Sequence, residues 1–251
     1  MATDNSSADR VEEVFYSRSD EKFTLRALLD EILGDRKFNK ALDVGPGAGH
    51  ISETLARRTR ELTMVELSPR YQDILRSQFE NARIITASIA EVPLKSEFEL
   101  ILFSHNLYYH PEDQWLSLCR RLFDLLVPGG ELIIIMNSDQ GDWWKIVGSY
   151  WEKLRESISF HYIPLSQFKK ELSCLAPLKV HPYRFHLWIE PGETWIKFVG
   201  RQILELSDES VLLDNEQNFL AMDKSFRHVD GKIELDFRAE IIRLKREAVK
   251  A

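Results

Sequence analysis

Three glycines, Gly45, Gly47 and Gly49, alternate with other residues directly after a short apolar run that ends at Val44. Glycine tolerates positive φ and has no Cβ, so such a turn lets backbone N–H groups approach a ligand closely. Residues 51–60 then have the apolar spacing of a helix. The pattern predicts a strand, a glycine-rich turn and a helix, which is typical of nucleotide-type sites in open α/β folds.

An acidic residue, Glu66, ends the next predicted strand, over 62–66. In open α/β sites a carboxylate at this place accepts hydrogen bonds from both ribose hydroxyls. A glycine turn alone can be purely structural, and Glu66 is the residue that favours the ligand-binding interpretation.

The spacing of the glycines separates the possible ligands. A nicotinamide dehydrogenase carries GxGxxG and faces a pyrophosphate, and a P-loop carries GxxxxGK[ST]; the second motif is absent here. Asp43, at the end of the first strand, would repel a pyrophosphate. S-adenosylmethionine has no phosphate and carries a sulfonium and an ammonium group, so the acidic loop favours this cationic cofactor.

Strands and helices alternate along residues 40–136, which predicts a Rossmann-like, doubly wound α/β fold with a seven-stranded, mostly parallel sheet. Ligands of such sheets lie at the carboxyl ends of the strands. The further strands are expected at 83–86, 100–103, 131–136, 178–189 and 233–244, and the further helices at 69–79, 115–126, 194–206 and 210–219, with a turn at 127–130.

The chain is expected to form a single domain over 1–251, because no repeat or linker interrupts it. Within it we expect a helical lid over 8–35, a cofactor-binding core over 38–136 and a substrate-covering part over 137–251.

Composition limits the partners. The net charge of −7 disfavours binding to a polyphosphate backbone, so we expect no nucleic acid. No run reaches the roughly 20 apolar residues of a membrane span, and no secretory signal begins the chain, so we expect no membrane partner and a cytoplasmic protein, as a monomer or dimer. The two cysteines form no CxxC pair and the histidines lack ligand spacing, so no metal site is expected.

These motifs resemble those of class I S-adenosylmethionine-dependent methyltransferases. The resemblance covers roughly residues 38–136 and implies that Ser88 and Ile89, after the third strand, contact the adenine. Ser88 departs from the Asp that is common there. We also expect Pro46, Leu67, Ser104 and His105 at the cofactor.

The segment after the fourth strand bears on the acceptor. It lacks the Asn/Asp-Pro-Pro-aromatic motif of amino-methylating nucleic-acid enzymes and the Pro-Cys nucleophile of base C5 methylation. Its Leu107-Tyr108-Tyr109 resembles the histamine N-methyltransferase family. Weaker matches lie at 19–22, 138–151, 162–163 and 230–233.

The second resemblance implies roles for individual residues. Glu21 would pair with a basic group of the substrate, and Lys22 would stand near the cofactor carboxylate. Glu21 could instead be a solvated helix residue, and the tyrosines and tryptophans of the expected acceptor site could be core residues. The remaining expected acceptor residues are mainly aromatic: Phe15, Asn106, Tyr108, Tyr109, Trp143, Trp144, Phe160 and Phe237.

The predicted reaction is N-methylation of a small cationic or polar amine (an amine, guanidine, imidazole or amino acid derivative) by direct displacement, in which alignment dominates. His105, Tyr108 and Tyr109 are the expected catalytic residues; His105 is either a proton acceptor or a wall residue. The alternatives are a small-molecule O-methyltransferase, with His105 or His110 as base, and a cofactor-binding protein without turnover.

Overall fold

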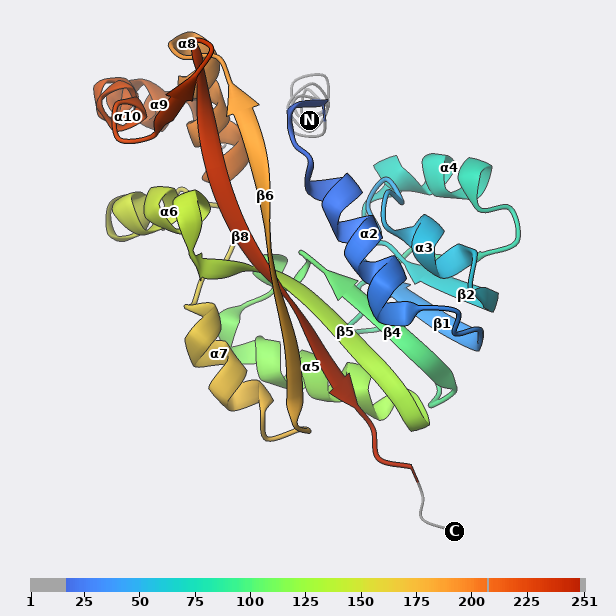
Figure 1. The fold of residues 1–251 in the computed structure, drawn as a ribbon. Helices are drawn as coiled ribbons and strands as arrows, with labels where there is room; N and C mark the ends of the chain where they lie inside the picture. The colour runs from blue at the N-terminus through green and yellow to red at the C-terminus, as the bar shows by residue number, and fades with distance from the viewer. Residues whose placement is uncertain (1–16, 207, 249–251) are drawn as a thin grey trace. The chain divides into compact units, whose positions relative to one another are not determined.

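The computed structural model describes residues 17–206 and 208–248 (Figure 1). The described residues divide into two compact units. Of the described residues, the first unit comprises 17–24, 137–161 and 183–239, and the second comprises 25–136, 162–182 and 240–248. The expectation of a single domain stays a prediction.

A sheet with parallel pairing along most of its length organises the strands. The described residues form eight strands, so the expected number of seven is wrong: the short β7, which pairs antiparallel with β8, was not foreseen. The order is β3-β2-β1-β4-β5-β8-β6. The strands are β1 (Phe38–Val44), β2 (Thr59–Val65), β3 (Arg83–Ile85), β4 (Phe98–Ser104), β5 (Leu126–Gln140), β6 (Leu178–Ile189), β7 (Arg227–Val229) and β8 (Lys232–Lys245).

Helices of the second unit lie on both faces of its strands. Figure 1 shows α2 and α3 on one side and α5 and α7 on the other. Such two-sided cover explains why the predicted strand segment 100–103 is apolar throughout and no more than 1% exposed. The helical elements are α2 (Glu21–Leu33, which starts in the first unit), α3 (Ser52–Ala56), α4 (Pro69–Gln78), η1 (Leu107–Tyr109), η2 (Glu112–Gln114), α5 (Trp115–Asp124) and α7 (Leu165–Leu172).

The first unit packs its helices around aromatic side chains. Trp195 is fully buried and donates a hydrogen bond from Nε1 to the carbonyl of Phe219 at 2.7 Å, and the Phe219 ring meets Tyr150 edge-on. Buried aromatic residues of this kind supply much apolar area and satisfy their polar atoms locally. The helices are α6 (Gly141–Leu154), α8 (Glu193–Lys197), the π-helix η3 (Phe198–Ile203), α9 (Glu209–Asp214) and α10 (Glu216–Asp223).

Several boundaries differ from the sequence-based expectation. The expected turn at 127–130 lies inside β5, where Gly129 N–H donates to the carbonyl of Arg246 and Arg246 N–H donates to that of Gly130. The expected helix over 51–60 is only five residues long, because β2 already begins at Thr59. None of the helices in the described ranges is long and apolar enough to cross a membrane.

Candidate functional site

The carboxyl ends of the parallel strands place the predicted cofactor residues next to one another. Val44, the last residue of β1, pairs with Val65 of β2 and with Phe103 of β4. Glu66 continues the ladder, because its N–H donates to the carbonyl of Ile85 at 3.0 Å. The glycine turn and Glu66 follow the ends of β1 and β2, and Ser104 is the last residue of the neighbouring β4, as the doubly wound topology requires.

Each of the three glycines adopts positive φ, but the space around them differs. A Cβ on Gly45 would lie 2.0 Å from Asn106 Nδ2, and one on Gly49 would lie 2.6 Å from the Phe79 ring. A Cβ on Gly47 would meet no atom within 4 Å. Gly45 and Gly49 thus permit close packing, whereas Gly47 leaves open space above the turn.

Glu66 holds the turn in place. Its side chain is buried, and Oε2 accepts a hydrogen bond from Gly47 N–H at 3.0 Å while Oε1 accepts one from Ser68 N–H at 2.8 Å. A carboxylate oxygen has more than one acceptor site, so these bonds leave capacity for ligand hydroxyls. The carboxylate that the sequence assigns to the ribose therefore also orders the loop.

Asp43 is the second carboxylate of this site and is only 2% exposed. Its Oδ2 has no hydrogen-bond partner among protein atoms; the Ser52 hydroxyl lies near enough to favour the charged form but lacks the geometry of a full hydrogen bond. Burial first, and the negative charge of Glu66 in addition, raise the pKa of Asp43 to about 7. A cationic ligand would relieve this electrostatic penalty.

Four further predicted cofactor residues, Pro46, Leu67, Ser88 and Ile89, belong to the second unit. Ser88 Oγ accepts a hydrogen bond from Ala90 N–H at 3.3 Å, and Ile89 is buried. Leu67 is 65% exposed, which is unusual for a leucine that follows a buried strand. Pro46 is half-buried, and its carbonyl accepts from Gly49 N–H within the turn. Their roles stay predictions.

The end of β4 leads into a turn of unusual geometry. His105 has a φ of 48°, and its N–H donates to the carbonyl of Ile135 at 2.9 Å, which fixes this left-handed conformation. Its ring stacks near Tyr108 with centroids 6.3 Å apart. Asn106 Oδ1 lies 3.3 Å from His110 Nε2. The segment thus places a histidine, an amide and a tyrosine together beside the glycine turn.

The two adjacent tyrosines of this segment differ in environment. Tyr108 is 9% exposed and meets the Trp115 ring edge-on at 6.3 Å, whereas Tyr109 is 55% exposed. Both were expected at the acceptor. Tyr108 packs in the core of the second unit, and Tyr109 is the more exposed of the two side chains.

The first unit holds Glu21 and Lys22 at the start of α2. Glu21 is only 3% exposed, and its Oε2 lies 3.2 Å from Lys22 Nζ. The adjoining Asp20 fastens this segment to β6: its N–H donates to the carbonyl of His186, and its Oδ1 accepts from His186 N–H at 2.6 Å. Burial of a carboxylate is expensive without partners, so Glu21 does not behave as the solvated helix residue that we considered.

The predicted aromatic acceptor residues of the first unit are mostly buried. Trp143 and Trp151 lie on the Phe160 ring with centroid distances of 6.3 and 6.1 Å. Trp144 is half-buried, and Phe237 packs edge-on against another phenylalanine ring. Phe15 lies outside the described residues, and the roles of the other residues stay predictions.

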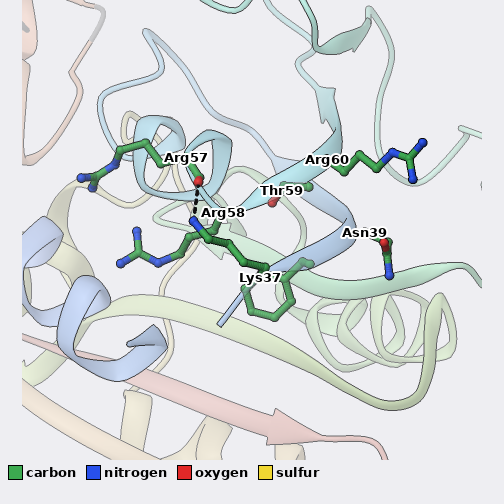
Figure 2. Close-up of a pocket in the computed structure, with 7 residues that line it drawn as sticks. Lys37, Asn39, Arg57, Arg58, Thr59 and Arg60 are labelled. Atoms are coloured by element: carbon green, nitrogen blue, oxygen red, sulfur yellow. Dashed lines mark hydrogen bonds between the residues drawn. The ribbon is translucent and has the colours of Figure 1, made fainter. Parts of the chain in front are cut away.

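A separate pocket lies at the amino ends of β1 and β2, opposite in the strands to the glycine turn (Figure 2). Its basic side chains already have partners in part: Lys37 Nζ donates to the carbonyl of Arg57, and Arg57 bonds the Asp30 carboxylate. In Figure 2 the side chains of Arg57 and Arg60 point in opposite directions. We therefore do not assign this pocket to the cofactor.

Two nearby residues were missed by sequence reasoning. Ser52 is buried beside Asp43, and Arg26 of α2 donates from Nε to the carbonyl of His50 in the glycine turn at 2.5 Å. The contact of Arg26 had a possible signal in the sequence: the charges at 26 and 30 and those at 53 and 57 are complementary and equally spaced, and Arg26 does pair with Glu53. No group of three or more metal-ligating side chains occurs in residues 17–206 and 208–248.

Comparison with known proteins gives these features a family context. Residues 41–130 match the family model described as "Methyltransferase domain". The chain is 26% identical over 116 residues to Nodulation protein S of Azorhizobium caulinodans, a match that covers 45% of this chain and 56% of that protein. The chain thus spans about half the length of this curated relative.

Solved structures agree on the fold. A Bacillus halodurans protein described as a candidate methyltransferase aligns with a TM-score of 0.67 at 16% identity, over 89% of this chain and 99% of that one. N-methyltransferase NodS from Bradyrhizobium japonicum, solved with S-adenosyl-L-homocysteine, aligns with a TM-score of 0.54 at 16% identity, over 90% and 86%. The expected Rossmann-like α/β fold is confirmed, and it is the fold of methyltransferases.

Proposed function

Since residues 41–130 form a methyltransferase domain, we propose that the protein is an S-adenosylmethionine-dependent N-methyltransferase of small cationic or polar amines. The observation that supports S-adenosylmethionine as the cofactor is the pair of buried carboxylates, Asp43 and Glu66, at the glycine turn. Asp43 Oδ2 lacks a protein partner, and open space lies above Gly47. An acidic, partly unsatisfied site of this kind fits a cation better than a phosphate.

S-adenosylmethionine supplies, when bound, a methyl group on a positively charged sulfur. In the proposed site Glu66 holds the ribose hydroxyls while it keeps Gly47 in position, and Asp43 provides negative charge. Ser88 and Ile89 would contact the adenine. The side chains after β4 contribute alignment of the acceptor, which is the main source of rate in a direct displacement.

The acceptor must present a neutral nitrogen with a free lone pair. His105 lies beside the turn and is our candidate for the group that takes the amine proton. A general base must lie within hydrogen-bond distance of the acceptor nitrogen, and a residue beside the turn could do so. Exposed Tyr109 would contact the acceptor, since an aromatic face stabilises a cation.

The amine class is supported by Glu21 and by a structural relative. Glu21 is a buried carboxylate, and such a group attracts a cationic substrate at a well-defined point. The NodS protein to which the fold aligns is an N-methyltransferase. The likeness to histamine N-methyltransferases, and with it an imidazole-bearing amine, belongs to this proposal, as do a cytoplasmic location and the lack of nucleic-acid and membrane partners.

A labelling experiment tests the proposal. The protein would be incubated with methyl-labelled S-adenosylmethionine and a panel of amines, guanidines, imidazoles, phenols and carboxylic acids, and the products identified by mass spectrometry. We expect label on nitrogen. Label on oxygen would make it an O-methyltransferase with His105 or His110 as base, and cofactor binding without any transfer would make it a binding protein.

Two substitutions locate the acceptor. Glu21→Gln removes charge with little change in shape, and it should raise KM for cationic amines about tenfold, a change of about 1.4 kcal/mol. Tyr109→Phe keeps the aromatic face that would contact the cation, so it should change KM little. The dissociation constant of S-adenosylhomocysteine should stay unchanged in both; its loss in Glu21→Gln would mean that Glu21 belongs to the cofactor site instead.

A further inference from the structure

Helix α2 and the segment made of α3 and its C-cap Arg57 carry complementary charges at the same four-residue spacing. Arg26 of α2 lies with a terminal guanidinium nitrogen 2.7 Å from Glu53 Oε2. One turn later, Asp30 accepts from Arg57 at 3.1 Å and contacts Arg58 at 2.9 Å. Residues four apart lie on one face of a helix, so these ion pairs join one face of α2 to α3.

Arg26 differs from the other members of this array because it also reaches the glycine turn. Its Nε donates to the carbonyl of His50 at 2.5 Å. His50 directly follows Gly49 and precedes α3. One guanidinium, with its several donors in a fixed plane, therefore bonds both the end of the turn and the first turn of the helix behind it.

The helix behind the turn cannot fix the turn by itself. α3 has only five residues, from Ser52 to Ala56, and no side chain caps its N-terminus. Helices this short are unstable in isolation and depend on tertiary contacts. Among the side chains that bond the turn, Glu66 accepts a hydrogen bond from Gly47 N–H near its middle, and Arg26 donates one to the His50 carbonyl near its end.

We propose that Arg26 is a positioning residue for cofactor binding: through the His50 carbonyl it fixes the backbone of residues 45–51 in the form that receives S-adenosylmethionine. The inference rests on the proposed function for the identity of the cofactor. In the proposed site Glu66 also serves the ribose, whereas the role argued for Arg26 is confined to the backbone of the turn. A mobile turn would have to be ordered on binding, and this ordering lowers affinity.

Three variants separate loop positioning from general stability. Arg26→Gln removes both the bond to His50 and the pair with Glu53. Glu53→Gln removes only the ion pair, and Arg57→Gln removes a pair with Asp30 at the far end of α3 without touching the turn. We expect Arg26→Gln to raise the dissociation constant of S-adenosylhomocysteine about tenfold by calorimetric titration, which corresponds to about 1.4 kcal/mol. The two controls should change it less than about twofold.

Amide hydrogen exchange supplies a readout that needs no ligand. In Arg26→Gln the peptide that contains residues 45–51 should exchange faster than in the wild type, while it should be unchanged in Arg57→Gln at a comparable melting temperature. Equal affinity and equal exchange in wild type and Arg26→Gln would overturn the inference, as would an equal loss in all three variants. If the wild type itself bound no S-adenosylhomocysteine, the cofactor assignment would fail, and the exchange of this peptide would still decide whether Arg26 fixes the turn.

Discussion

Replacing Asp43 by Asn separates the charge of this side chain from its shape. In the folded protein, burial first and the charge of Glu66 in addition raise the pKa of Asp43 from 3.8 to about 7, against the opposing effect of Ser52. The native state therefore retains a proton over a pH range in which the unfolded chain has released it. The contribution of this proton to the unfolding free energy is fully present below the pKa of Asp43 in the unfolded chain. It is lost as the pH rises from about 4 through about 7.

The magnitude follows from the size of this shift. One pKa unit corresponds to about 1.36 kcal/mol. A rise in the pKa from 3.8 to about 7 therefore makes about 4 kcal/mol of the unfolding free energy depend on the protonation of Asp43. Asn is neutral at every pH and nearly isosteric with Asp. The Asp43→Asn variant should therefore exceed the wild type in stability at pH 8 by up to about 4 kcal/mol and resemble it at pH 4.

Urea denaturation of both proteins at several pH values between 4 and 8 measures the effect. The quantity to compare is the difference in unfolding free energy between variant and wild type at each pH, because other titrating groups cancel in that difference. We expect the difference to grow steadily as the pH rises. A difference that does not vary with pH would refute the idea that Asp43 is buried and protonated in the native state.

Three further perturbations follow from the structure. The affinity for S-adenosylmethionine should rise as the pH increases through about 7, because the cation favours the charged form of Asp43, and calorimetry should show a weaker trend for S-adenosylhomocysteine, which lacks the sulfonium. Gly49→Ala should lower the unfolding free energy by about 2–4 kcal/mol in urea titrations, because its Cβ would meet the Phe79 ring at positive φ, whereas Gly47→Ala, with open space, should cost about 1 kcal/mol. Glu131→Gln should destabilise by about 2–3 kcal/mol at neutral pH, since two arginines bond this buried carboxylate and outweigh its burial to lower its pKa; the loss should shrink in acid as the wild-type carboxylate protonates.

The sequence predicted the parallel strands well because their signal is local. Each strand from 40 to 136 is a short apolar run between turn residues, and most of these runs were located within a few residues. The failures concern hydrogen bonds made far along the chain. Gly129 and Gly130 look like a turn in isolation, but their backbone pairs with Arg246, which local periodicity does not reveal.

The candidate site was predictable to the same extent. Asp43, Glu66 and the glycines occupy neighbouring strand ends, because the fold brings these ends together whatever the side chains are. The burial of Glu21 was not predictable, because it depends on the packing of α2 rather than on its polar neighbours. The contact of Arg26 with the turn likewise depends on how two helices lie side by side.

The hydrogen bonds of Glu66 affect how its substitution would have to be understood. Its two oxygens accept hydrogen bonds from Gly47 N–H and Ser68 N–H, so this side chain shapes the turn as well as offering acceptor oxygens to a ligand. A Glu66→Gln variant would turn one acceptor oxygen into a donor that faces another donor, and the turn would rearrange before any ligand arrived. Weaker binding in that variant would then have two causes, the rearranged turn and the lost contact with the ligand. A structure of the variant would distinguish them.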